Sequence, residues 1–200
     1  AQASSVQSVL TAISTKLTPQ LIRQFEHSVA DTGLLLNCLN WYSRALKADL
    51  LHKDSPCVTA LFRSALEQMQ QWAERHDPDL LNQRQLAKCM VQLNTMVKQG
   101  LIVTDPGTRS GQADRQAWSR CVTQLCDRFL STDRWLKECD VVELINVTNT
   151  LKDGIDAGLL DATEAGLQRS LDLIADRIVQ QAYAGHGHLA ALSNCANFLR

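Results

Sequence analysis

The sequence predicts an all-α fold, an α-solenoid of helix-turn-helix repeats with about three and a half to four units. The main observation is a segment that recurs without gaps. "LLNCLNWYSRALKADLL" at 35–51 aligns with "LAKCMVQLNTMVKQGLI" at 86–102 and "LINVTNTLKDGIDAGLL" at 144–160, and "LSNCANFLR" at 192–200 continues the alignment. A second apolar pattern of helical period lies between consecutive copies, so each unit contains two helices.

The recurring segment predicts the first helix of each unit. Its first, eighth, twelfth and sixteenth positions are apolar in the three long copies, which is the spacing of one helix face. We expect these helices at 35–50, 86–101, 143–159 and 190–200. Gly100 and Gly158 stand just before the last apolar pair, where a glycine commonly ends a helix through a left-handed residue.

The second helices are predicted from apolar patterns within 58–72, 122–129 and 167–179. Breaker segments separate them from the first helices: "KDSP" at 53–56, "TDPGTRSGQ" at 104–112 and "DATEAG" at 161–166. Near the start of the chain, two short helices are expected. Thr18 would cap the second of them and Pro19 would be its first residue.

These elements predict one helical repeat domain over residues 1–200. Its units are 1–33, 34–84, 85–142, 143–189 and a partial unit at 190–200. Because the last copy stops inside its first helix, we expect a fragment of a longer array; the alternative is that this half-unit is itself the cap.

The composition argues against several classes of protein. Twenty basic and 21 acidic residues give no basic excess for a nucleic-acid backbone, and no apolar run is long enough to insert into a membrane. The seven cysteines include no Cys-x-x-Cys pair, which suits a reducing compartment. Cys38, Cys89 and Cys195 share one helix position and are expected to be small buried apolar residues. No cluster has metal-ligand spacing, so neither a metal nor a cofactor is expected.

Asparagines recur on the helix face opposite the apolar stripe. Asn37, Asn146 and Asn194 occupy the third position of the repeat, and Asn40, Asn149 and Asn197 the sixth. These positions lie roughly 140° to 200° from the middle of the stripe. Lys88 and Val91 interrupt both columns in the second copy. The amides either form ladders between units or are exposed as a binding row along a concave surface.

The motif L-x-N-x-L-N-x-x-S, written "LLNCLNWYS" at 35–43 and more weakly in the third and fourth copies, supports a resemblance. It resembles the start of the unit in SKWP-repeat type III effectors of plant-pathogenic bacteria, which consist of tandem helical units related to HEAT and armadillo arrays. Ser43-Arg44 matches only the beginning of Ser-Lys-Trp-Pro, and no Trp-Pro follows. The resemblance implies a protein of the bacterial cytoplasm that acts in a host cell after secretion, without catalytic residues.

No phosphate loop, zinc-protease motif or nucleophile elbow occurs, so we expect no enzymatic activity. The leading hypothesis is a scaffold that binds another protein, host or bacterial. The alternatives are a helical-repeat RNA-binding segment and a purely structural repeat segment of a larger enzyme. The candidate contacts are Asn37, Asn40, Trp41, Lys88, Asn146, Asn149, Asn194 and Asn197.

Overall fold

The computed structural model describes residues 2–27, 32–75, 81–102, 109–131 and 140–183. Every regular element in these ranges is a helix, which confirms the all-α class. The helices are α1 (Gln2–His27), α2 (Thr32–Lys47), α3 (Pro56–Glu74), α4 (Gln83–Lys98), α5 (Arg109–Leu130), α7 (Val141–Asp156) and α8 (Ala165–Tyr183).

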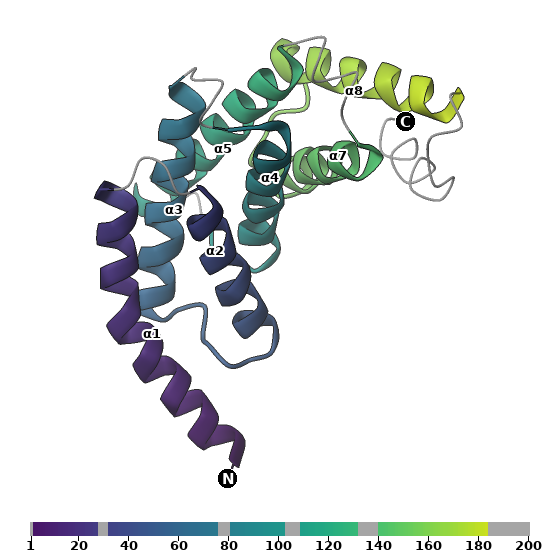
Figure 1. Cartoon of the computed structure of the whole chain (residues 1–200). Coiled ribbons are helices and arrows are strands. Elements are labelled where there is room, and N and C mark those ends of the chain that lie inside the picture. The colour runs from purple at the N-terminus through teal and green to yellow at the C-terminus, as the bar shows by residue number, and fades with distance from the viewer. Residues whose placement is uncertain (1, 28–31, 76–80, 103–108, 132–139, 184–200) are drawn as a thin grey trace.

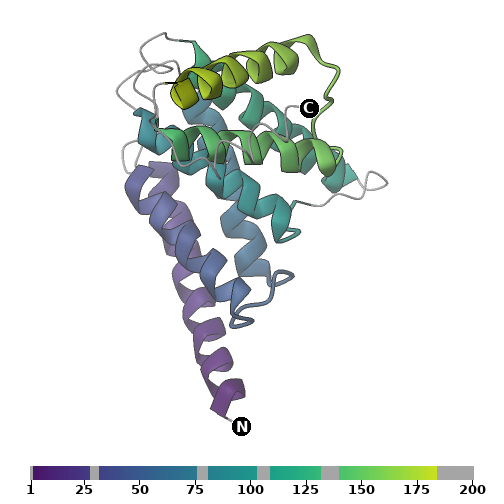
Figure 2. The same cartoon turned by 90° about the vertical axis from the view of Figure 1, so that its right-hand side faces the viewer.

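The helices pack in two rows, as expected of a helical repeat. α2, α4 and α7, the first helices of their units, pack side by side in one row, and α1, α3, α5 and α8 form the other. The rows curve together so that α2, α4 and α7 line the inner side of an arc, with α1 at one end and α8 at the other (Figure 1). Figure 2 shows the same arrangement from the side, with the N-terminal part of α1 extending beyond the other helices.

The inner-row helices end in the same way, which is direct structural support for the repeat. At the fifteenth position of each copy the backbone is left-handed, with φ of 54° at Asp49, 64° at Gly100 and 65° at Gly158. The next amide then reaches back to a carbonyl five residues earlier, at 2.9, 2.9 and 2.8 Å. This is the Schellman pattern expected at the two glycines, with an aspartate, which tolerates this conformation, in the first copy.

The inner helices begin two or three residues earlier than the apolar stripe predicted. Asn82 and Asp140 each accept a hydrogen bond from a backbone amide of the first turn, while Gln85 and Glu143 reach back to the cap backbone. These capping boxes satisfy amides that have no partner within the helix, so the helix starts at the cap rather than at the first buried leucine. The helix expected at 190–200 lies outside the described residues.

Two expectations about breakers were wrong. Thr18 and Pro19 lie inside the single helix α1 and do not begin a second one. Thr18 is buried, and its hydroxyl is 2.7 Å from the Tyr42 hydroxyl of α2, so it joins two helices instead of capping one. An interior proline removes one helical hydrogen bond and bends the helix, and the ribbon of α1 is bent (Figure 1). Likewise, α5 already begins at Arg109, inside the predicted turn at 104–112.

Side-chain hydrogen bonds to backbone carbonyls fix the position of each helix relative to its neighbours. Trp118 on α5 is fully buried and donates its indole N–H to the Leu93 carbonyl of α4 at 3.0 Å. The Thr150 hydroxyl of α7 lies 2.9 Å from the Met90 carbonyl of α4 and 2.8 Å from the Asn146 carbonyl of its own helix, and it can donate its one proton to either. Between the outer helices, the Arg128 guanidinium of α5 donates to the Trp72 carbonyl of α3 at 2.7 Å.

The Trp118 ring requires a glycine on α7. A Cβ atom at Gly154 would stand 2.5 Å from Trp118 Cη2 and 2.9 Å from Leu160 Cδ1, closer than such atoms approach in folded proteins. Gly154 therefore lets the α5 tryptophan pack directly against the α7 backbone. Gly166, near the start of α8, provides a contrast because a Cβ there would meet nothing within 4 Å.

We predict that Gly154→Ala lowers the free energy of unfolding by about 1–2 kcal/mol, because the overpacking of Trp118 outweighs the better helix propensity of alanine. Thermal melting monitored by circular dichroism should show a decrease of about 2–8 °C. Gly166→Ala should leave the melting temperature unchanged or raise it. Equal effects of the two substitutions would contradict this account of the α5–α7 contact.

Candidate functional site

The asparagine columns lie on the exposed side of the inner row. Asn37, Asn40 and Asn149 are exposed, and Asn146 is half-buried. They come from equivalent positions of α2 and α7, the two helices that flank α4 in the inner row (Figure 1). We call the exposed side of the inner row the inner face. It consists of the third, sixth and tenth positions of the 35–51, 86–102 and 144–160 repeats, which are Asn37, Asn40, Arg44, Lys88, Val91, Thr95, Asn146, Asn149 and Asp153.

The exposed amides do not form ladders within the described part of the chain. No hydrogen bond joins the side chains of Asn37, Asn40 or Asn149 to another described residue. Exposed amides of this kind keep both a donor and an acceptor available to a ligand. The columns are interrupted at α4, where Lys88 is exposed and Val91 is half-buried. Asn194 and Asn197 lie outside the described residues.

The three inner-row helices are unequally charged, which the total charge of the chain conceals. α2 contains Arg44 and Lys47 and no acidic residue. α4 contains Arg84, Lys88 and Lys98, again with no acidic residue. α7 instead contains Glu143, Asp153 and Asp156 with one lysine.

One ion pair joins these two parts of the row, because Lys98 Nζ lies 2.9 Å from Asp153 Oδ2. The exposed side chains of Arg44, Lys47, Arg84 and Lys88 then leave the α2–α4 part basic. Sequence reasoning missed Arg44, Lys47 and Arg84 as site residues. The absence of acidic residues from 32–47 and 83–98 was the signal that could have identified them.

Trp41 lies beside the inner face, at the seventh position of the repeat. Its equivalents are Gln92 on α4 and Thr150 on α7, which are 7% and 0% exposed, whereas Trp41 is 45% exposed. Thr150 faces the preceding inner helix, because its hydroxyl lies 2.9 Å from the Met90 carbonyl. Trp41 packs edge-on against Tyr42, with ring centroids 5.0 Å apart.

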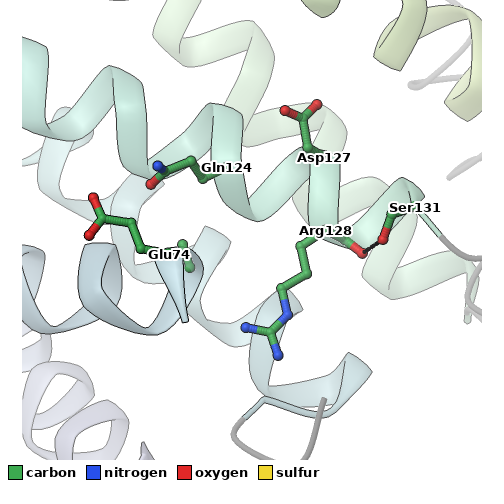
Figure 3. A pocket seen from close by; sticks show the side chains of 6 residues that line it. Glu74, Gln124, Asp127, Arg128 and Ser131 are labelled. Atoms are coloured by element: carbon green, nitrogen blue, oxygen red, sulfur yellow. Dashed lines mark hydrogen bonds between the residues drawn. The ribbon is translucent and has the colours of Figure 1, made fainter. Parts of the chain in front are cut away.

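A pocket of about 350 Å³ lies in the outer row between the C-terminal ends of α3 and α5. Ala73, Glu74, Gln124, Asp127, Arg128 and Ser131 line it. Figure 3 shows the carboxylates of Glu74 and Asp127 and the guanidinium of Arg128 pointing in different directions. Arg128 is held by the Trp72 carbonyl, and partial burial raises the pKa of Asp127. The charged groups do not converge on one point, so they form no acid–base pair.

The buried cysteines are not arranged as nucleophiles or metal ligands. Burial raises the pKa of Cys89 and of Cys126 to about 12, and it also raises the pKa of Cys121 well above its ordinary value. Cys89 is buried as expected, Cys38 is only half-buried, and Cys195 is not among the described residues. The part of the chain that the structure describes contains no group of three or more potential metal ligands. None of its helices is long and apolar enough to cross a membrane.

No family model matches the chain, and comparisons with curated proteins and with solved structures found no significant match. The function is therefore argued from the helical-repeat packing and from the chemistry of the inner face.

We predict that Asn37→Ala, Asn40→Ala and Asn149→Ala each change the free energy of unfolding by no more than about 0.5 kcal/mol, because they remove exposed side chains. Thr150→Ala is the matched control. It removes a buried hydroxyl bonded to Met90 and should cost about 1–3 kcal/mol. Chemical denaturation of the four variants measures the difference. Losses at the three asparagines as large as that of Thr150→Ala would show that the amides stabilise the array.

A second prediction concerns thiol chemistry. Because the thiolate is the reactive form, Cys89, Cys121 and Cys126 should resist iodoacetamide at pH 8 until the protein is unfolded. Half-buried Cys57 should be alkylated in the folded protein. Peptide mass spectrometry after timed quenching gives the rate at each site. Equal rates at Cys57 and Cys89 in the folded protein would contradict the burial of the α4 and α5 thiols.

Proposed function

We propose that the protein is an interaction scaffold whose inner face binds an extended, acidic segment of another protein. The observation that carries this proposal is the pairing of α2 and α4, two adjacent inner helices with five basic residues and no acidic one. Basic residues concentrated on one surface favour a partner of opposite charge and accelerate its association.

The exposed amides supply the polar contacts that such a partner needs. An extended segment has backbone N–H and C=O groups at regular intervals, and Asn37, Asn40 and Asn149 offer matching acceptors and donors. Packed helices are about 8–10 Å apart, so three inner helices span about 20 Å between their axes. Roughly six or seven extended residues cover that distance.

The unequal charge of the inner helices also sets the direction in which the partner segment lies across them. Carboxylates of the partner would pair with Arg44 and Lys88, whereas α7 has one lysine, Lys152, which is already paired with Asp156. The acidic part of the segment therefore lies over α2 and α4, and its neutral or basic part over α7.

Within this proposal the chain is a segment of a bacterial type III secreted effector that acts in a host cell, and it works by binding, without catalysis. The support is the resemblance of the motif at 35–43 to the SKWP-repeat unit, together with packing consistent with a helical repeat.

RNA is the second candidate partner, and the same basic helices are the observation that favours it. Arg44, Lys47, Arg84 and Lys88 could pair with phosphates, and the exposed ring of Trp41 could stack on a base. The acidic residues of α7 argue against a nucleic-acid path along the whole row.

The test compares two labelled probes by fluorescence anisotropy. One is an unstructured peptide of about ten residues with alternating glutamates, and the other is a single-stranded RNA of matching length. We expect the peptide to bind more tightly. The double variant Arg44→Glu/Lys88→Glu should weaken peptide binding by roughly tenfold or more, because it replaces attraction with repulsion.

Arg169→Glu is the matched control, because Arg169 is an exposed arginine on α8 of the outer row. It should bind the peptide like the unmodified protein. Tighter binding of RNA, with a steep dependence on salt, would replace the protein partner by RNA. Equal peptide affinities for the double variant and the control would refute the inner face as the binding surface.

A further inference from the structure

A second pocket, of about 370 Å³, lies where the turn after α2 meets the C-terminal end of α4. We call it the boundary pocket, because it lies between two consecutive units of the repeat. The polar side chains that line it are Lys47, Asp49, His52, Lys53, Asp54 and Gln99. Lys47 also belongs to the basic part of the inner row, so the boundary pocket adjoins the proposed binding surface.

Contacts from α1 and α4 hold the wall of the boundary pocket in place. The chain leaves α2 through the left-handed residue Asp49. Gln7 of α1 donates its side-chain amide to the Asp49 carbonyl at 3.1 Å, and the same nitrogen lies 2.9 Å from His52 Nε2. Lys53 reaches the end of α4, because its Nζ lies 3.6 Å from the place of a Cβ on Gly100. The pocket is therefore preformed, which lowers the entropic cost of binding a ligand.

Gln99 gives the boundary pocket an acceptor that no described protein group uses. Its side-chain nitrogen donates to the Ser43 carbonyl of α2 at 3.0 Å, which fixes the orientation of the amide. The amide oxygen of Gln99 is buried and has no hydrogen-bond partner among the described residues. A buried oxygen without a partner is unfavourable, so this group favours a ligand that supplies an N–H donor.

The next boundary of the inner row shows which charged group such a site accepts. Lys98 of α4 has Asp153 of α7 beside it, with 2.9 Å between Nζ and Oδ2. The equivalent positions at the α2–α4 boundary are Lys47 and Thr95. Thr95 has no charge, and no carboxylate of the described residues forms an ion pair with Lys47. The α2–α4 boundary therefore has the lysine of this ion pair without its acidic partner.

The charges around the boundary pocket place the anionic group of a ligand on the side of the inner face. Arg44 precedes Lys47 by three residues, so these two exposed cations are neighbours on the surface of α2. Asp49 and Asp54 follow on the turn and balance the charge of Lys53 there. A carboxylate is therefore favoured beside Lys47 and disfavoured beside the turn.

We propose that the boundary pocket binds one aspartate or glutamate side chain of the extended partner segment. Its carboxylate pairs with Lys47, as Asp153 pairs with Lys98, and a backbone N–H of the same segment donates to the Gln99 amide oxygen. This inference rests on the proposed function. It adds a fixed position for one acidic residue, and that position sets the register of the segment on the inner face.

The test adds the glutamate peptide, amidated at its C-terminus, to isotope-labelled protein and follows side-chain amide signals by nuclear magnetic resonance. We expect shifts at Gln99 as well as at Asn37 and Asn40. In anisotropy titrations Lys47→Ala and Gln99→Met should each weaken peptide binding roughly threefold to tenfold, because each removes one contact. Lys16→Ala is the control, since Lys16 is an exposed lysine of α1 outside the pocket, and it should leave the affinity unchanged. Circular dichroism checks that every variant is folded.

The outcomes separate the boundary pocket from the inner face. Shifts at Asn37 and Asn40 without one at Gln99, or full peptide affinity in both pocket variants, would overturn the pocket and leave the inner face in place. A shift at Gln99 alone would support the pocket and reject the inner face as the path of the segment, and no shift at any of the three would reject both. A peptide with glutamines in place of the glutamates and a free C-terminus tests the other source of a carboxylate. A shift of Gln99 with this peptide alone would assign the pocket to a chain end and overturn the proposal.

Discussion

The fold depends on one constraint, which is that an inner-row helix can bury its flank only against the inner helix before it. Gln92 on α4 and Thr150 on α7 are buried for this reason, and the Thr150 hydroxyl uses the contact to bond to the Met90 carbonyl. α2 has no described helix in the corresponding place, so Trp41 remains half-exposed. Each inner helix therefore covers a flank of the next one along the row. An amphipathic helix that cannot bury its apolar stripe alone is stabilised by these neighbours.

The repeated helix ends keep this arrangement in register. Left-handed residues at Asp49, Gly100 and Gly158 end the three inner helices at the same position, so the chain leaves each of them toward the outer row in the same way. The outer helices then lie between successive inner ones. Trp118 shows how closely they fit, because it donates to an α4 carbonyl while its ring lies against Gly154 of α7. The separation of the rows leaves the opposite side of the inner helices, with its amides and basic side chains, free for a ligand.

The helical period of the apolar residues and the breaker segments between them predicted the helical class, the order of the helices and the glycine ends, because these features depend on local spacing. The starts of α4 and α7 were missed because capping side chains, rather than buried leucines, define them. Pro19 was misread because a proline can lie inside a helix that it bends, and because Thr18 contacts Tyr42 of α2 instead of capping a helix, which local sequence does not reveal. For the site, the asparagine columns could be read from the sequence. The charge asymmetry was missed because it appears only when charges are counted helix by helix, and the exposure of Trp41 depends on a neighbour that sequence spacing does not reveal.

Among the described helices, the main contacts join neighbours within and between the two rows, and none of these main contacts joins α1 to α8. In such an architecture a small rotation at each boundary adds to the next, so the curvature can change while every core stays packed. A change of angle at one boundary would therefore move α1 relative to α8. A ligand that spans α2, α4 and α7 would alter the spacing of these helices. The distance between α1 and α8 would then change with it.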